Sequence, residues 1–139
     1  MASKDEWSLK EVRMKDSPVV SFFRKNLMPS VVPGNDDYSY LVYLTFHYTP
    51  KDASGLPTKE IEEILFNIED SVILMLENEG LSIHIAAVLQ NGIKDLLFHT
   101  NDPDKFLERA TYFRDKYPEL NVECEITSDP KWEQYHDFP

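Results

Sequence analysis

Residues 81–100 read LSIHIAAVLQNGIKDLLFHT, and this stretch decides the fold. Two segments rich in apolar residues, 81–90 and 93–100, flank the dipeptide Asn91-Gly92. Asn-Gly accepts the positive φ angles of a tight type I′ turn. The stretch therefore predicts two antiparallel strands joined as a hairpin.

A helix is predicted on each side of this hairpin. Before it, one apolar stripe recurs at steps of three and four residues, at Ile61, Ile64, Leu65, Ile68, Val72, Met75 and Leu76. Thr58 or the preceding Leu56-Pro57 can begin this helix, and Gly80 stands where a C-terminal glycine is expected. After the hairpin, Asp102-Pro103 is typical of an N-cap and first helical residue, and Tyr117-Pro118 ends the second helix.

Residues 38–48, before the first helix, are rich in aromatic and β-branched side chains. Residues 122–127, after the second helix, alternate between apolar and polar side chains. Both segments are therefore predicted to be strands. The order over 38–127 is then β-α-β-β-α-β. This order predicts an α+β, ferredoxin-like fold, in which a four-stranded antiparallel sheet carries both helices on one face. The residues expected to face the helices are Val42, Leu44, Phe46, Ile83, Ile85, Ala87, Leu89, Leu96, Phe98, Val122, Cys124 and Ile126.

The whole chain, 1–139, is interpreted as one domain with a short extension at each end. Residues 1–37 include two strands, 7–14 and 18–23, that form an N-terminal β-hairpin. This hairpin can extend an edge of the sheet or lie over its open face. Residues 128–139, SDPKWEQYHDFP, begin with a second Asp-Pro signal, so one or two helical turns should follow. Trp132 and Tyr135 would share one face, as a C-terminal aromatic latch, although a ligand platform is the alternative.

Charge limits the partners that this chain can have. The net charge is −11, and residues 50–80 hold two lysines against eight acidic residues. A field of this sign repels phosphate backbones, so we expect no direct binding of nucleic acid; solubility alone or a basic protein partner explains the charge. Without a long apolar run, a secretory signal or a cysteine pair, the chain is expected to be cytoplasmic and not to bind membranes.

Only a few positions are candidates for binding a metal or for catalysis. The sheet face away from the helices is expected to show Tyr43, Thr45, His47, His84, Asp95, His99, Glu123 and Glu125. A His84–His99 pair fits the strand directions, but a three-histidine site does not, so neither a metal nor a cofactor is predicted. The carboxylates Glu62, Glu63, Glu69 and Asp70 are interpreted as a solvated helix face, and Cys124 as a buried structural thiol. No nucleophile or phosphate-loop motif occurs.

Several motifs together carry a family resemblance: Trp7 near the start, Gly55-Leu56-Pro57 before the long helix, the Asn-Gly hairpin, and DP-x-W-x-x-Y from Asp129 to Tyr135. In this order they resemble the bacterial family catalogued as domain of unknown function number 695. Such domains are similar to the ribonuclease E inhibitor B family, which has a ferredoxin-like fold and acts by binding a protein. The resemblance implies regulation by association, although the long acidic tail of that inhibitor is absent.

We therefore expect a non-enzymatic binding or regulatory module that associates with another protein. The alternative is a small-molecule sensor or enzyme with a pocket between the open sheet face and the N-terminal hairpin. The candidate lining of that pocket is Tyr43, His84, His99, Trp132 and Tyr135.

Overall fold

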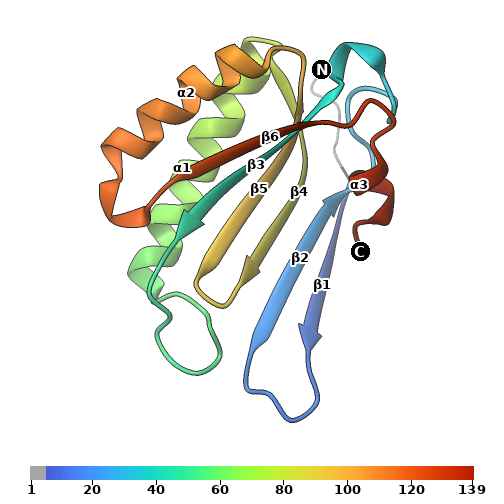
Figure 1. Ribbon diagram of the computed structural model, residues 1–139. Coiled ribbons are helices and arrows are strands. Elements are labelled where there is room, and N and C mark those ends of the chain that lie inside the picture. The colour runs from blue at the N-terminus through green and yellow to red at the C-terminus, as the bar shows by residue number, and fades with distance from the viewer. Residues whose placement is uncertain (1–5) are drawn as a thin grey trace.

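The computed structural model describes residues 6–139 apart from the side chain of Glu77 (Figure 1). Its strands are β1 (Trp7–Arg13), β2 (Val20–Asn26), β3 (Tyr40–His47), β4 (Ser82–Gln90), β5 (Ile93–Thr100) and β6 (Glu123–Ser128). Its helices are α1 (Lys59–Asn78), α2 (Pro103–Lys116) and α3 (Glu133–Asp137), with short 3-10 turns at Asp36–Tyr38 and Pro118–Leu120.

The six strands form one antiparallel sheet in the order β1-β2-β4-β5-β3-β6. The architecture is therefore α+β. The N-terminal hairpin lies in the sheet, because β2 pairs with β4 from Ser21 opposite Gln90 to Lys25 opposite Ala86. Of the two predicted positions for the hairpin, the structure has the one that extends an edge.

The predicted Asn-Gly hairpin is confirmed. Asn91 and Gly92 have φ angles of 41° and 88°, and the flanking strands pair from Gln90 opposite Ile93 to Ser82 opposite Thr100. Gly92 also donates its N–H to the carbonyl of Gly55, which joins the turn to the loop before α1.

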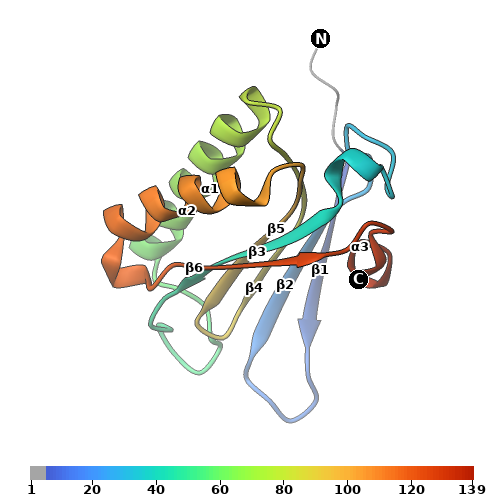
Figure 2. The same cartoon turned by 45° about the horizontal axis from the view of Figure 1, so that its top comes forward.

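Helices α1 and α2 pack on the same face of the sheet and α3 lies on the other (Figures 1 and 2). The main core lies between the sheet and the two long helices, and includes Leu44, Phe46, Ile68, Val72, Leu96, Phe98 and Phe106. With two helices over six strands, the helix-side face of β1 and β2 extends beyond the helix layer.

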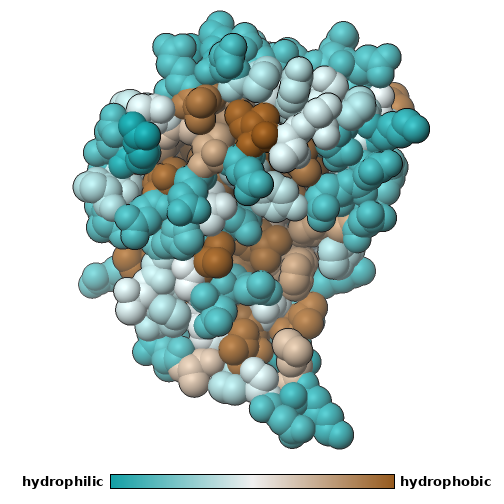
Figure 3. Space-filling model, viewed as in Figure 1, coloured by the Kyte–Doolittle hydropathy of each residue, from teal (hydrophilic) through white to brown (hydrophobic). Residues whose placement is uncertain are grey.

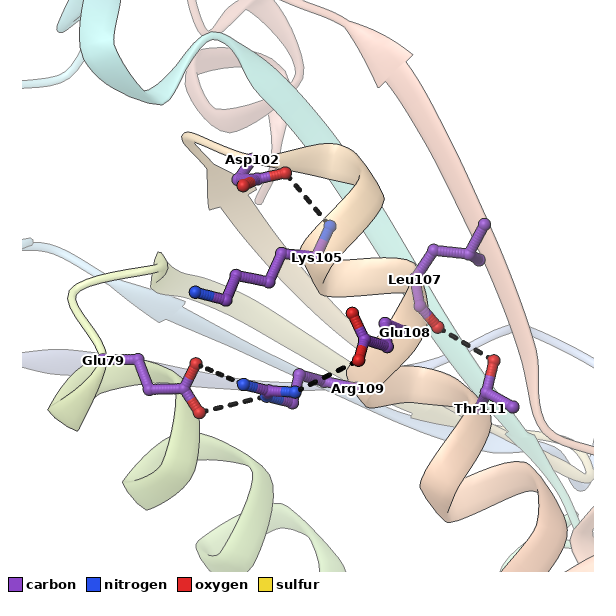
Figure 4. Close-up of polar contacts among 7 residues, drawn as sticks. All are labelled: Glu79, Asp102, Lys105, Leu107, Glu108, Arg109 and Thr111. Carbon is purple, nitrogen blue, oxygen red and sulfur yellow. Dashed lines mark hydrogen bonds and ion pairs between the residues drawn. The ribbon is translucent and has the colours of Figure 1, made fainter.

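The ends of α1 and α2 are also joined by charge. Arg109 of α2 donates from Nε and Nη2 to the two carboxylate oxygens of Glu79 at 3.0 and 3.1 Å, and Glu108 lies on its other side (Figure 4). Glu79 stands near the C-terminus of α1, where the helix dipole disfavours an anion. Arg109 supplies the compensating cation.

The predicted side-chain orientations of three residues in β4 are wrong. A register shift between His84 and Ala86 interrupts the ladder with β5, so that His84 lies opposite Phe98 and Ile85 has no partner there. A bulge of one residue reverses the faces of the residues before it. His84 therefore faces the helices, while Ile83 and Ile85 pack on the open face, the reverse of the prediction.

The view in Figure 3 shows hydrophobic side chains interspersed with hydrophilic ones, and a hydrophilic protrusion at the turn between β1 and β2. Among residues 6–139, no helix combines the length and the hydropathy that crossing a bilayer requires.

Candidate functional site

A cleft opens on the helix side of the sheet, between α1 and the strands that extend beyond it. The strand register builds its floor from two neighbouring rows of side chains. One row crosses the sheet as Leu9, Arg24 and Ala87, and the other as Phe22, Leu89 and Lys94. Because paired residues point to the same face, both rows face α1.

The cleft has a volume of about 310 Å³ and a mostly apolar lining: Leu9, Phe22, Pro57, Leu65, Phe66, Ala87 and Leu89. Leu9 and Phe66 are 65% and 50% exposed and form its rim. The charged lining residues are Arg24, Glu62 and Lys94. An apolar cleft with a few convergent charged groups is the usual form of a binding site.

Beside the cleft, the buried Glu69 of α1 pairs with both cations of the floor. Arg24 donates from Nη2 to the two carboxylate oxygens of Glu69 at 2.6 and 2.7 Å, and Lys94 Nζ lies 3.0 Å from Oε1. Glu69 and Lys94 are 5% and 7% exposed. The prediction that Glu69 belongs to a solvated helix face is therefore wrong, because β2 and β5 place two cations against that side of α1.

His84 lies beside this cluster. Its ring is 4.9 Å from the ring of Trp7 and 4.8 Å from that of Phe98, between centroids, and Arg24 lies over Trp7. Within residues 6–139, His84 Nε2 is buried and has no hydrogen-bond partner. Burial lowers the pKa of His84 to about 4, so the imidazole is neutral at pH 7.

Neighbouring charges also alter the pKa values of Glu69 and Lys94. Burial alone would raise the pKa of Glu69, but Lys94 and Arg24 outweigh that effect and hold it below its usual value. Burial lowers the pKa of Lys94, and the nearby Glu69 opposes this change. Glu69 is ionised at neutral pH, and the cluster holds two cationic side chains for one carboxylate.

The five residues predicted to line a pocket lie on two faces of the sheet. Tyr43, His99, Trp132 and Tyr135 lie on the open face, and His84 lies on the helix face. The predicted His84–His99 pair does not form, because the bulge in β4 turns His84 away. The hairpin extends the sheet edge, so it does not cover the open face as the predicted pocket requires.

The C-terminal segment occupies part of that open face. Trp132, Tyr135 and Phe138 are buried against Leu41, Ile85, Ala86 and Leu97. Trp132 Nε1 donates to the carbonyl of Tyr38, and Tyr135 Oη donates to the carbonyl of Asn26 at 2.7 Å. The predicted helical turn is confirmed as α3, and Asp129 accepts hydrogen bonds from the N–H groups of Glu133 and Gln134.

Two further contacts between polar side chains lie outside the cleft. His47 Nε2 lies 3.6 Å from Glu123 in a shallow depression of about 710 Å³, and Thr45 donates to Asp95 at 2.5 Å on the same face. Among the described residues, no three His, Cys, Asp or Glu side chains gather in a way that could hold a metal ion.

Comparison with known proteins places the chain in a family. A family described as "Family of unknown function (DUF695)" matches residues 5–138. The chain belongs to this family. The match includes the strands and helix of the cleft as well as the C-terminal segment. Comparison with curated proteins gave no match. Comparison with solved structures gave none either.

In this DUF695 chain, sequence reasoning missed Arg24 and Lys94 of the cleft and assigned Glu69 to a solvated helix face. Arg24 lies one residue beyond the predicted end of its strand, and Lys94 was not considered as a site residue. The available signal was the helical spacing of Glu62, Phe66 and Glu69, which places them on one side of α1 next to the core stripe.

Proposed function

We propose that this protein is a non-enzymatic binding module that associates with another protein through the cleft between α1 and the β1–β2 hairpin. The observation that carries the proposal is the rim of the cleft, where Leu9 and Phe66 are 65% and 50% exposed beside an apolar interior. Exposed apolar side chains that continue into an apolar cleft are typical of interaction sites.

The low reactivity expected of the Cys124 thiol and of the ionic cluster supports a binding function over catalysis. Burial raises the pKa of the Cys124 thiol to about 11, so very little thiolate exists at neutral pH. Glu69 is paired with both Arg24 and Lys94, an arrangement that suits recognition more than proton transfer.

The acidic character of the chain favours a partner with basic residues around its apolar contact. Glu60, Glu63 and Asp70 are exposed on α1, next to the wall of the cleft. A net charge of −11 makes a nucleic-acid partner unfavourable, because phosphates carry the same sign.

We also propose that residues 40–128 form a ferredoxin-like unit and that the C-terminal segment latches its open face. Support comes from the chain order β3-α1-β4-β5-α2-β6, the sheet order β4-β5-β3-β6, and the burial of Trp132. The resemblance of the sequence motifs to domains similar to the ribonuclease E inhibitor B family implies a role in protein association.

Site-specific photo-crosslinking tests the proposal. The photoreactive residue p-benzoylphenylalanine replaces Phe66 at the rim or, as a control, Tyr112 on α2, which is 55% exposed. After irradiation in native lysate, we expect a discrete cross-linked product from position 66 alone. Leu9→Asp in the same chain should abolish it. Identical products from both positions, or none from position 66, would contradict the proposal.

A further inference from the structure

The cations at the floor of the cleft have hydrogen-bonding capacity left over. A guanidinium carries five N–H donors and an ammonium three. Within residues 6–139, the hydrogen bonds of the Arg24 side chain come from Nη2, and the ion pair of Lys94 is with Glu69. Most N–H donors of these two groups therefore remain for a ligand in the cleft, which both residues line.

The charges of the cluster are also unbalanced. Arg24 and Lys94 carry two positive charges, and Glu69 is the one carboxylate that pairs with both of them; Glu62, which also lines the cleft, is exposed and acts on Lys94 from a distance. His84 adds no charge at neutral pH. A net charge held away from water is costly unless an opposite charge accompanies it. An additional anion beside Arg24 and Lys94 would balance the charges that are in direct contact, and the exposed Glu62 would oppose it.

We propose that the cleft recognises a carboxylate attached to an apolar group, with the carboxylate on Arg24 and Lys94 and the apolar group against Phe22, Leu65 and Leu89. This inference rests on the cleft of the proposed function and specifies its ligand. The carboxylate can come from an apolar segment of a protein partner or from a free aliphatic acid, which offer the same chemistry.

Two features of the cleft set the selectivity. Lys94 lies under the ring of Phe66, with Nζ 5.5 Å from the centroid, so the ammonium sits at the boundary of the apolar lining. Glu62 also lines the cleft, but it is exposed, and its negative charge opposes an incoming carboxylate. Removing the charge of Glu62 should therefore strengthen binding, whereas removing that of Lys94 should weaken it.

The experiment uses the full chain at pH 7.5 with two probes of equal length, octanoate and octanamide. Binding constants are measured by NMR titration. We expect octanoate to bind about tenfold more tightly than octanamide, since charge-assisted hydrogen bonds are the stronger kind. Lys94→Met should remove this preference, and Lys116→Met, on the exposed part of α2, should keep it. Glu62→Gln should tighten octanoate binding and leave octanamide unchanged.

Arg24→Gln provides a second test of the carboxylate site, and it should also reduce the preference for octanoate. This variant is the deciding one if Lys94→Met does not fold. The proposal is overturned if octanoate fails to bind the wild-type chain, if both probes bind equally, or if the preference survives in the folded variants of Lys94 and Arg24.

Cross-linking from position 66 separates this inference from the proposed function. If octanoate, but not octanamide, suppresses the cross-linked product, a protein partner presents the carboxylate. If octanoate binds selectively and no product forms, the ligand is a free acid: the inference stands and the proposed function fails. If a product forms and the two probes bind equally, the proposed function stands and the inference fails.

Discussion

Trp132 and His99 stack face to face, with ring centroids 4.1 Å apart and ring planes inclined by 7°. Both rings contact the same carbonyl oxygen, that of Tyr38, through Trp132 Nε1 and His99 Nδ1 at 2.9 Å. Because His99 Nδ1 must carry a proton to donate to a carbonyl, its Nε2 is unprotonated in the neutral ring. This stack joins the C-terminal segment to β5.

Trp132→Ala should destabilise the protein strongly. Trp132 is fully buried, and truncating a buried aromatic side chain costs about 3–5 kcal/mol of unfolding free energy. Tyr112→Ala is the matched control, because Tyr112 is 55% exposed and its loss should change the unfolding free energy by less than about 0.5 kcal/mol. Urea unfolding measures both. Equal losses in the two variants would contradict the packing described for Trp132.

Acid should destabilise the fold through its buried histidines. The folded-state pKa of His84 is about 4, below the ordinary value of 6.5, because the side chain is buried. The unfolded chain therefore takes up a proton first, and stability is lost as the pH falls from about 6.5 to 4. The loss through His84 is about 3 kcal/mol. Burial also lowers the pKa of His99 to about 4, which acts in the same direction.

His84→Gln tests this pH dependence. Urea unfolding at several pH values should show that the loss of unfolding free energy between pH 7 and pH 4 is smaller in the variant by about 3 kcal/mol. A variant whose pH profile runs parallel to that of the wild type would show that His84 does not carry the effect.

Sequence periodicity predicted the secondary structure well because most of its elements bury one face. The bounds of the second strand differ: residues 18–23 were predicted, and β2 is Val20–Asn26. Arg24, Lys25 and Asn26 are polar and gave no strand signal. In the structure, each of these side chains bonds to a residue that is distant in the sequence. Arg24 bonds to Glu69, Lys25 to the carbonyl of Phe138, and Asn26 to the carbonyl of His84.

The candidate site was the part that the sequence could not predict. Strict alternation in β4 placed His84 on the open face, and one bulged residue reversed it. Glu69 is off the apolar stripe of α1, and only the pairing of β2 with β4 and of β4 with β5 brings Arg24 and Lys94 to it. Such contacts depend on sheet order, which local patterns do not specify.

Breaking the ionic cluster at the cleft floor should cost far more than breaking the pair between the helices. Glu69→Gln removes the charge that holds Arg24 and Lys94, and the loss of a partner from a buried ion pair costs about 3 kcal/mol of unfolding free energy. Glu79→Gln, which breaks the exposed pair with Arg109, should have a much smaller effect (Figure 4). Thermal and urea unfolding compare the two, and losses of the same size would contradict the burial of Glu69.

Gly55→Ala should be more harmful than Gly34→Ala. Both glycines have positive φ angles, 81° and 91°, so alanine is strained at each position. A Cβ on Gly55 would also lie 2.7 Å from the Cα of Asn91, whereas a Cβ on Gly34 would meet nothing within 4 Å. The additional cost at Gly55 should be about 1–3 kcal/mol of unfolding free energy. Equal costs in urea unfolding would show that the loop before α1 does not pack on the hairpin turn.

The central claim is that the cleft between α1 and the β1–β2 hairpin is the binding site. Octanoate added to ¹⁵N-labelled protein tests it most directly through the shifts of backbone amide signals. We predict that the largest changes occur at Phe22, Phe66 and Leu89, which line the cleft. Changes centred on Tyr43, Trp132 and Tyr135 of the open face would contradict the claim.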